Sequence, residues 1–325
     1  MRYPPNRQFP ASRQMSDPFK TARRGTPSLA VMDDIFAAGD RFLLNHARLL
    51  ERRLFATCFL GQPAKHVVDA LRGYQNDDGG FGHALEPDKR CPASLPIDVE
   101  TAFQALATAK TVDPGMVSRA CDFLADAAAD AGGGGAVPLA FPVIEDFPRA
   151  AHWTDWTYEP GLNPTAGLVG LLYQLGVEHP WRSAGEAYCW QSLESGALPA
   201  DAHALSETLI FLEQVPDRER AGQQAAVLAA SLPEIAMFRL DPDAEGYGLT
   251  PLTIAPRADS RWRSLFSEAQ INGHLDRLVK DQQDDGGWPI AWEPPSEAAV
   301  CEWRGVVTLA ALRTLTSYGR ITPGG

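Results

Sequence analysis

The chain has 325 residues, of which 45% are hydrophobic and 22% are charged, a composition typical of a globular protein with a substantial core. Its net charge of −12 argues against nucleic acid as a partner, because a phosphate backbone attracts a basic surface. No apolar run approaches the roughly 20 residues that a membrane-spanning helix needs, so we expect no transmembrane segment.

The N-terminal stretch differs in composition from the rest of the chain. Residues 1–24 carry six basic side chains against one acid, Asp17, together with several prolines and serines. They lack the apolar stretch of a secretory signal. We expect residues 1–30 to form a disordered basic arm and residues 31–320 to form a single domain. Five cysteines without metal-binding spacing favour reduced thiols, and we therefore expect a cytoplasmic protein.

Hydrophobic periodicity predicts helices along almost the whole domain. The pattern favours helices over 34–60 with one break, and over 64–75, 98–110, 114–129, 164–176, 180–194, 201–213, 218–231, 264–282 and 299–318. Asp113-Pro114 and Asn163-Pro164 each place a capping side chain before a proline, which marks a helix start. Three of the helices, over 98–110, 164–176 and 299–318, are apolar on nearly all sides. Their alternation with amphipathic helices predicts two layers.

Long irregular segments separate some of these helices, over 82–97, 132–163 and 241–259. Loops of this length in a compact domain are usually functional or disordered. The aromatic content of the second segment argues against disorder. That segment combines an acid with stacking surfaces, so we take Asp155 as a catalytic candidate and three neighbours as substrate-binding candidates: Trp153, Trp156 and Tyr158.

Residues 71–88 and 278–295 repeat one pattern. Leu, Gln, paired Gly and an aromatic residue recur at a constant offset, so that Gln75 matches Gln282 and Phe81 matches Trp288. A self-match at a fixed offset indicates repeated structural units. Paired glycines allow the reversed backbone that ends a helix, and the Gln side chain can bond main-chain groups of the turn. We expect each copy to fasten one helical hairpin to the next.

The repeated form, Leu-x3-Gln-x3-Gly-x-aromatic, resembles the core of the QW motif of squalene and terpene cyclases and of protein prenyltransferase β subunits. Within that superfamily the chain is most similar to small single-domain bacterial proteins labelled prenyltransferase-like. The match rests on residues 71–81 and 278–288, and both copies lack the basic-small pair and the aromatic residue that precede Leu in the full motif. The same core occurs in other α/α toroids, including some polysaccharide lyases and thioester domains.

The resemblance implies an all-α fold, an α/α toroid of about five to six helical hairpins in two concentric layers. It also implies an isoprenoid substrate in the central cavity. The catalytic strings of the superfamily, DxDD, DDxxD and the Asp-x-Cys zinc site, do not occur in this sequence. The string DVETA resembles the tail of the DxDD region, so the resemblance leaves Asp98 or Glu100 as a catalytic candidate. The alternative is that these acids only stabilise the first turn of a helix.

An acid-proline step occurs three times, as Leu85-Glu86-Pro87, Tyr158-Glu159-Pro160 and Trp292-Glu293-Pro294. If the helices close into a ring, these loops lie at equivalent places around one rim. Three acids facing one mouth would favour proton uptake by one of them or bind a cation such as Mg²⁺. The alternative is that each Glu accepts main-chain hydrogen bonds in an equivalent turn.

The remaining candidates lie beside these acids. Glu86 and Asp88 are catalytic candidates on one loop, where His83 is a substrate-binding candidate. Near the start of the last helix, Trp292, Trp303 and Arg304 are substrate-binding candidates. The Arg would grip a phosphate or carboxylate of a ligand, or else pair with Glu302 or another acid of the chain.

We therefore expect an enzyme that processes a small isoprenoid, as a terpene cyclase or prenyltransferase-like protein without the standard motifs. Rim acids would donate protons or bind Mg²⁺, and aromatic faces would stabilise a carbocation. Two alternatives stay open. Paired carboxylates and aromatic platforms also serve glycoside cleavage. The same fold without catalysis would be a module that binds a ligand or a protein.

Overall fold

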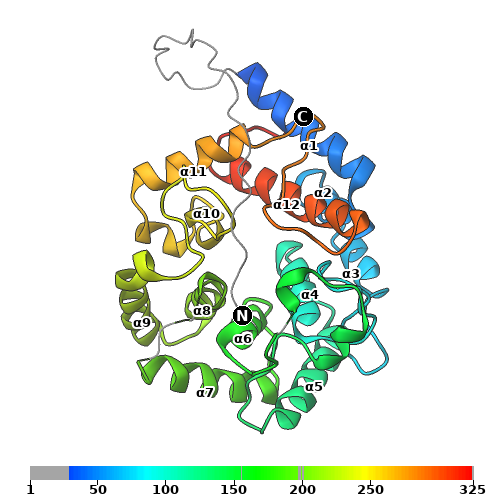
Figure 1. The fold of residues 1–325 in the computed structure, drawn as a ribbon, viewed down its shortest axis with the longest axis vertical. Coiled ribbons are helices and arrows are strands. Elements are labelled where there is room, and N and C mark those ends of the chain that lie inside the picture. The colour runs from blue at the N-terminus through cyan, green and yellow to red at the C-terminus, as the bar shows by residue number, and fades with distance from the viewer. Residues whose placement is uncertain (1–28, 155, 197–198, 200, 324–325) are drawn as a thin grey trace, which may run out of the picture.

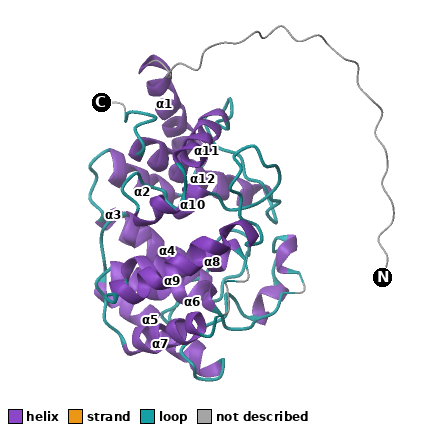
Figure 2. Cartoon of the chain, turned by 90° about the vertical axis from the view of Figure 1, so that its left-hand side faces the viewer, coloured by secondary structure: helices purple, strands orange, loops and turns teal. Residues whose placement is uncertain are grey.

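The computed structural model describes residues 29–154, 156–196, 199 and 201–323, with the backbone alone for 29–33. This part of the chain is all-α and contains no strand, only three isolated bridge pairs (Figure 2). Figure 1 labels its α-helices: α1 (Leu29–His46), α2 (Leu49–Phe59), α3 (Lys65–Leu71), α4 (Pro96–Thr108), α5 (Pro114–Asp130), α6 (Leu162–Gln174), α7 (Pro180–Glu194), α8 (Ala202–Gln214), α9 (Arg218–Ser231), α10 (Pro251–Ile254), α11 (Glu268–Lys280) and α12 (Glu297–Ser317).

The ten helical segments predicted from periodicity are confirmed, and only the four-residue α10 and the short 3₁₀ turns were not foreseen. The predicted break inside 34–60 falls between α1 and α2, where Arg48 adopts an extended backbone. The basic arm expected over 1–30 lies outside the described residues except for its last two, which already belong to α1. None of the helices in the described ranges is both long and apolar enough to cross a membrane.

The two predicted capping sites differ in outcome. Asp113 Oδ1 accepts a hydrogen bond from the Met116 N–H at 3.0 Å and caps α5 as expected. At the start of α6 no side chain forms a cap, and Asn163 instead leaves helical dihedral angles with φ −97° and ψ 114°. The Asn therefore bends the chain into α6 without satisfying its first amide groups.

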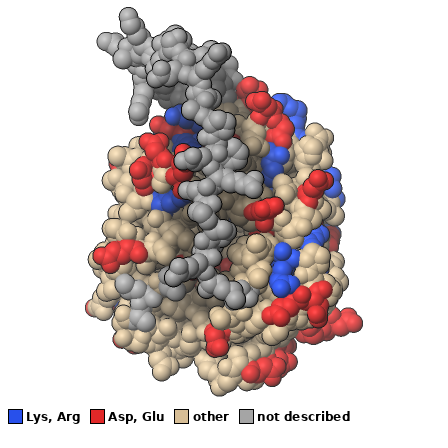
Figure 3. All heavy atoms as spheres, in the orientation of Figure 1, with Lys and Arg blue, Asp and Glu red and all other residues tan. Residues whose placement is uncertain are grey.

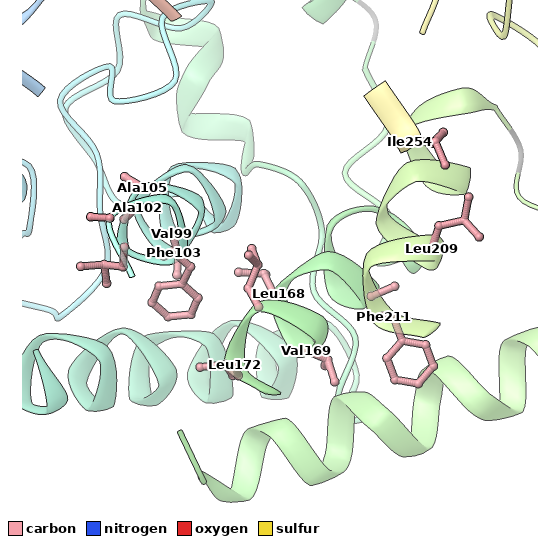
Figure 4. Packing of buried hydrophobic residues seen from close by; sticks show 14 of the residues in the cluster. Val99, Ala102, Phe103, Ala105, Leu168, Val169, Leu172, Leu209, Phe211 and Ile254 are labelled. Carbon is pink, nitrogen blue, oxygen red and sulfur yellow. The ribbon is translucent and has the colours of Figure 1, made fainter. Parts of the chain in front are cut away.

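Buried helices alternate with helices that cover them. The buried helices α4, α6 and α8 pack in that order, and each also contacts the amphipathic helix that follows it in the chain. Every residue of α6 from Pro164 to Leu172 is buried, as its apolar surface predicts. Figure 4 shows buried hydrophobic side chains that α4, α6, α8 and α10 contribute to the core: Val99, Ala102, Phe103, Ala105, Leu168, Val169, Leu172, Leu209, Phe211 and Ile254.

The last helix is less buried than its sequence suggests. In α12, Val306 and Val307 are half-buried and Ala310 is exposed. A groove of about 410 Å³ opens along this side of the helix, between α10, α11 and α12. Apolar composition alone therefore overstated the burial of α12, because it does not show which faces a neighbour covers.

The first and last helices of the described chain lie side by side (Figure 1). The C-terminal α12 packs against α11, α1 and α2, and the larger of two hydrophobic clusters extends from Ile35 to Ile321. Acidic side chains are spread over several parts of the face in Figure 3, in keeping with the net charge of −12.

The two repeated turns have the same geometry. Gln75 Nε2 donates to the Gly79 and Met116 carbonyl oxygens at 2.8 and 2.9 Å, and Gln282 Nε2 donates to those of Gly286 and Ile35 at 2.9 Å each. Met116 lies in α5 and Ile35 in α1, so each Gln fastens its turn to another helix. The predicted role of the repeat is thereby confirmed, and the second copy joins the C-terminal part of the chain to the first helix.

The glycines of these turns are required by their conformation. Gly79 and Gly286 have φ angles of +89° and +91°, in the left-handed region that favours glycine. A Cβ atom would lie 2.4 Å from the Arg119 carbonyl oxygen in the first copy and 2.2 Å from the Ala38 carbonyl oxygen in the second. Both turns therefore press their backbone against a neighbouring helix.

Candidate functional site

The loop that follows the first repeated turn, over residues 83–89, places charged side chains in the protein interior. His83 and Ala84 adopt left-handed backbones with φ +57° and +58°, although neither is glycine. The chain then runs inward, and Glu86, Asp88 and Lys89 are 8%, 4% and 1% exposed. Charged side chains are rarely buried so deeply unless they are paired, so this loop requires partners within the fold.

The first of these partners are the ion pair between Lys89 and Glu86 and the carboxylate of Asp98 at the start of α4. Lys89 Nζ donates to Glu86 Oε2 and lies 4.8 Å from the ring centroid of Trp153. The Glu86 N–H donates to Asp98 Oδ1 at 2.6 Å. Asp98 lies in the first turn of α4 and is 1% exposed, and its Oδ2 has no hydrogen-bond partner. A buried carboxyl oxygen without a hydrogen-bond donor is unusual, and such an environment favours the protonated form of Asp98 over the charged one.

Burial raises the pKa of Asp98 to about 7, against the opposing effects of Lys89 and of the Glu86 N–H. A carboxyl group with this pKa is about half protonated at neutral pH, whereas an ordinary Asp is ionised. Asp98 can therefore donate or accept a proton near pH 7.

Asp88 is linked to Asp98 through Glu86, since the Asp88 N–H donates to Glu86 Oε2, and its carboxylate is held by two indoles. Its Oδ1 accepts hydrogen bonds from Trp292 Nε1 at 3.1 Å and Trp303 Nε1 at 2.7 Å, and its Oδ2 lies 3.5 Å from His152 Nε2. Burial, followed by the charge of Glu86, raises the pKa of Asp88 to about 6, while the two indole donors lower it. We call Glu86, Asp88, Lys89 and Asp98 the acid cluster. Two of its carboxyls, those of Asp88 and Asp98, have raised pKa values and different partners.

Aromatic rings continue from the acids towards the surface. Trp153 packs on Trp156 with ring centroids 4.8 Å apart. Trp292 lies edge-on to Trp303 at 5.0 Å and to Tyr247 at 5.8 Å. Tyr247 is 39% exposed. Its ring stacks on His203, whose Nε2 lies 2.8 Å from the Tyr247 Oη. We call these aromatic residues the aromatic wall; they come from two irregular segments, from the second repeat and from α12.

A second pair of buried acids lies between α4 and α8. Glu100 and Glu207 are 6% and 9% exposed, and Gln104 Nε2 donates to Glu100 Oε1 at 2.8 Å. The two carboxyls approach each other where Gly167 of α6 has no side chain, since a Cβ there would lie 1.6 Å from Glu207 Oε2 and 3.4 Å from Glu100 Oε1. Burial raises the pKa of both groups, and two adjacent carboxyls can bond each other only when one is protonated.

Most of the candidate site residues named from sequence come together in the acid cluster around Asp98 and in the aromatic wall. The structure groups Glu86, Asp88 and Asp98 with the aromatic candidates Trp153, Trp156, Trp292 and Trp303. It adds Lys89, His152, His203 and Tyr247, which the sequence did not indicate. The one signal in the sequence for these residues was that Lys89 follows the candidate acids Glu86 and Asp88 within three positions.

Other candidates lie apart from the cluster. Arg304 forms a two-pronged pair with Asp285 of the second turn, at 2.7 Å for both bonds, so it holds an acid of the chain instead of gripping a ligand. His83 Nε2 lies 2.8 Å from Asn76 Oδ1 in the first turn, and Tyr158 Oη donates to Glu145 at 2.9 Å. Asp155 lies outside the described residues.

The expected ring of three equivalent acids is not formed. Glu86 is buried, but Glu159 and Glu293 are exposed. In the described parts of the three loops, only the residues of the first form a left-handed turn that directs the acid inward. Among the described residues, no group of three or more His, Cys, Asp or Glu side chains is placed to hold a metal ion, so this part of the chain offers no ligand set for the expected Mg²⁺.

No model of a known protein family matches the chain, and a search of curated proteins finds no significant match.

Proposed function

We propose that the chain is an α/α toroid that binds a neutral isoprenoid and transfers a proton to it from Asp98. The contacts of α12 with α1 and α2, and the bond from Gln282 to Ile35, support a closed arrangement of the helices. The observation that carries the functional proposal is Asp98 itself, a buried carboxyl with a pKa of about 7 and an oxygen free of partners.

The proposed step is general acid catalysis on an alkene. The π electrons of the alkene take the proton from Asp98 Oδ2, so a C–H bond forms and the O–H bond breaks. The electron pair of that bond stays on the carboxylate, while positive charge remains on the substrate. The Glu86 N–H and Lys89 stabilise the new carboxylate, since both lower the pKa of Asp98. Indole faces near a cation contribute about 1–2 kcal/mol each, which is the role we give the aromatic wall.

The charges around the site favour a neutral substrate over a prenyl diphosphate. Three basic side chains beside the cluster are already paired with an acid: Lys89 with Glu86, Arg48 with Glu51, and Arg90 with Glu302. A diphosphate would bring several negative charges next to buried carboxyls, and these three cations are already engaged. We therefore place prenyl transfer from a diphosphate below protonation of a polyene.

A carbohydrate substrate is the second candidate, because Trp292 and Tyr247 together present a partly exposed aromatic surface of the kind on which sugar rings stack. In that reading, Asp88 and Asp98 would be the two carboxyls of a glycosidase. A polyene is favoured because the unpartnered oxygen of Asp98 lies fully buried, whereas a sugar would require polar partners there.

The test is gas chromatography with mass spectrometry of extracts after incubation with squalene, or with prenyl diphosphates of ten, fifteen and twenty carbons, in Mg²⁺ or in EDTA. We expect cyclic or hydroxylated products from squalene in both buffers. Asp98→Asn should abolish them, and Glu293→Gln, which changes the exposed acid of the second copy, should not.

Turnover that survives in Asp98→Asn would contradict the assigned role. A complete lack of product from every polyene and diphosphate would contradict the isoprenoid proposal, and release of sugars from an oligosaccharide panel would then support the second candidate.

A further inference from the structure

A groove between α1 and α2 exposes an apolar surface away from the acid cluster. It has a volume of about 300 Å³ and is lined only by residues of these helices and their ends. Leu44, Leu49 and Leu60 line it and are 66%, 49% and 55% exposed. We call these three residues the leucine patch.

Exposed leucines are unremarkable when they are scattered, but these are gathered. The other strongly exposed large hydrophobic residues of the described chain are distributed among separate elements: Val112, Val143, Val227, Met237 and Tyr247. A contiguous apolar patch edged by polar residues is typical of a surface that binds another protein.

Charged side chains of both signs line the same groove. Asp40 lies on the α1 side, and Arg52 and Arg53 lie on the α2 side. Within the described residues none of these three side chains forms an ion pair. Arg48, Arg72, Arg90 and Arg304, by contrast, each pair with an acid. An apolar centre with an unpaired polar rim is the usual anatomy of a protein interface.

We propose that this groove is the centre of an interface between two copies of the chain. In a two-fold dimer the same patch meets itself, so each residue must find its partner in the opposite copy. The groove satisfies this requirement, because leucine meets leucine and Asp40 of one copy meets the arginines of the other. A stable dimer buries roughly 800 Å² on each partner, so the leucine patch would be the core of a wider contact.

The distribution of charge favours a second copy over other occupants. The basic arm over residues 1–24 would bring its positive charges towards Arg52 and Arg53, and like charges at short distance repel. An acidic partner would satisfy the arginines but leave Asp40 facing negative charge. A second copy offers one acid and two arginines, the same balance as the rim itself, whereas the arm offers six basic side chains against one acid.

Sedimentation velocity over a concentration series tests the proposal. The full chain should sediment as a dimer at high concentration and dissociate on dilution. Leu44→Glu should raise the dissociation constant by about tenfold or more, because each change acts twice in a symmetric interface. Val227→Glu is the matched control, since Val227 is 54% exposed on α9 and should leave the dimer unchanged.

A charge exchange makes the test specific for self-pairing. Asp40→Arg should weaken the dimer, and adding Arg52→Asp and Arg53→Asp in the same chain should restore it, because the rim regains both signs. A chain that stays monomeric at all concentrations overturns the proposal. So does a dimer that Leu44→Glu leaves unchanged, or one that the triple exchange fails to restore while circular dichroism shows the fold intact.

Discussion

The two repeated turns share their fastening geometry and then diverge. In both, a Gln bonds a neighbouring helix, an Asp accepts the amide of the second glycine, and the aromatic residue is buried. After the first turn the chain buries Glu86, whereas after the second turn Glu293 stays exposed. The positions that repeat are therefore those that hold the fold, and the candidate chemistry lies where the copies differ.

The second copy still contributes to the cluster, in a different way. At the position equivalent to Leu85 it carries Trp292, whose indole bonds Asp88. Its Asp285 is held by Arg304, where the corresponding Asp78 of the first copy is held by Ser94. One loop thus supplies acids and the other supplies an aromatic ring, and a shared turn supports both.

Alanine at the turn glycines should have the largest effect on stability. Gly79→Ala and Gly286→Ala each combine a left-handed backbone with a Cβ that collides with a main-chain oxygen, so we expect losses on the order of 3 kcal/mol. Gly319→Ala is the control, because Gly319 has φ +65° with open space around it and should cost about 1 kcal/mol. Urea unfolding measures all three. Equal losses at all three sites would show that neither turn is pressed against its neighbour.

Neutralising the acid that follows each repeated turn should reduce stability in the first copy and leave it nearly unchanged in the second. Glu86→Gln leaves Lys89 buried without its counter-charge, so we expect a loss of about 2 kcal/mol. Glu293→Gln alters an exposed side chain and should stay within about 0.5 kcal/mol of the parent protein. Thermal unfolding of the two variants makes the comparison, and a similar result for both would contradict the contrast between the loops.

The acid pair between α4 and α8 lies outside both copies and predicts a pH dependence. Burial raises the pKa of Glu207, so the folded protein keeps a proton that the unfolded chain releases above about pH 4.3. The stability contributed by this proton is complete below that pH and is lost as pH rises through the folded pKa.

Glu207→Gln carries no charge, so it should stabilise the protein relative to the parent at pH 8, where the parent loses the contribution of this proton, and change little at pH 4. The control Glu213→Gln, on the same helix, should show the same difference at both pH values. Urea unfolding at the two pH values makes the measurement, and a stabilisation by Glu207→Gln that does not depend on pH would contradict the proton-sharing pair.

The helices and turns could be predicted because their determinants are local. Periodic leucines and alanines define each buried face, and Gln with paired glycines defines the turn within a few residues. The burial of Glu86 could not be predicted in the same way. It depends on left-handed backbones at His83 and Ala84, where no glycine signals the conformation.

The partners in the cluster depend on contacts between distant parts of the chain. Trp303 follows its partner Asp88 by 215 residues, and Glu207 meets an acid on another helix beside Gly167. The expectation of three equivalent rim acids treated a repeated tripeptide as a repeated structure. It was wrong because the surrounding loops differ.

The proposed function depends most directly on Asp98 as a buried acid that holds a proton near neutral pH. Carbon-13 NMR of aspartate carboxyl groups, recorded from pH 4 to 9 in the parent protein and in Asp98→Asn, follows this group directly. We expect one carboxyl signal with a midpoint near pH 7, present in the parent protein and missing from Asp98→Asn. If the signal assigned to Asp98 instead titrates near its ordinary value of about 3.9, Asp98 is ionised at neutral pH and the proposed proton donor is contradicted.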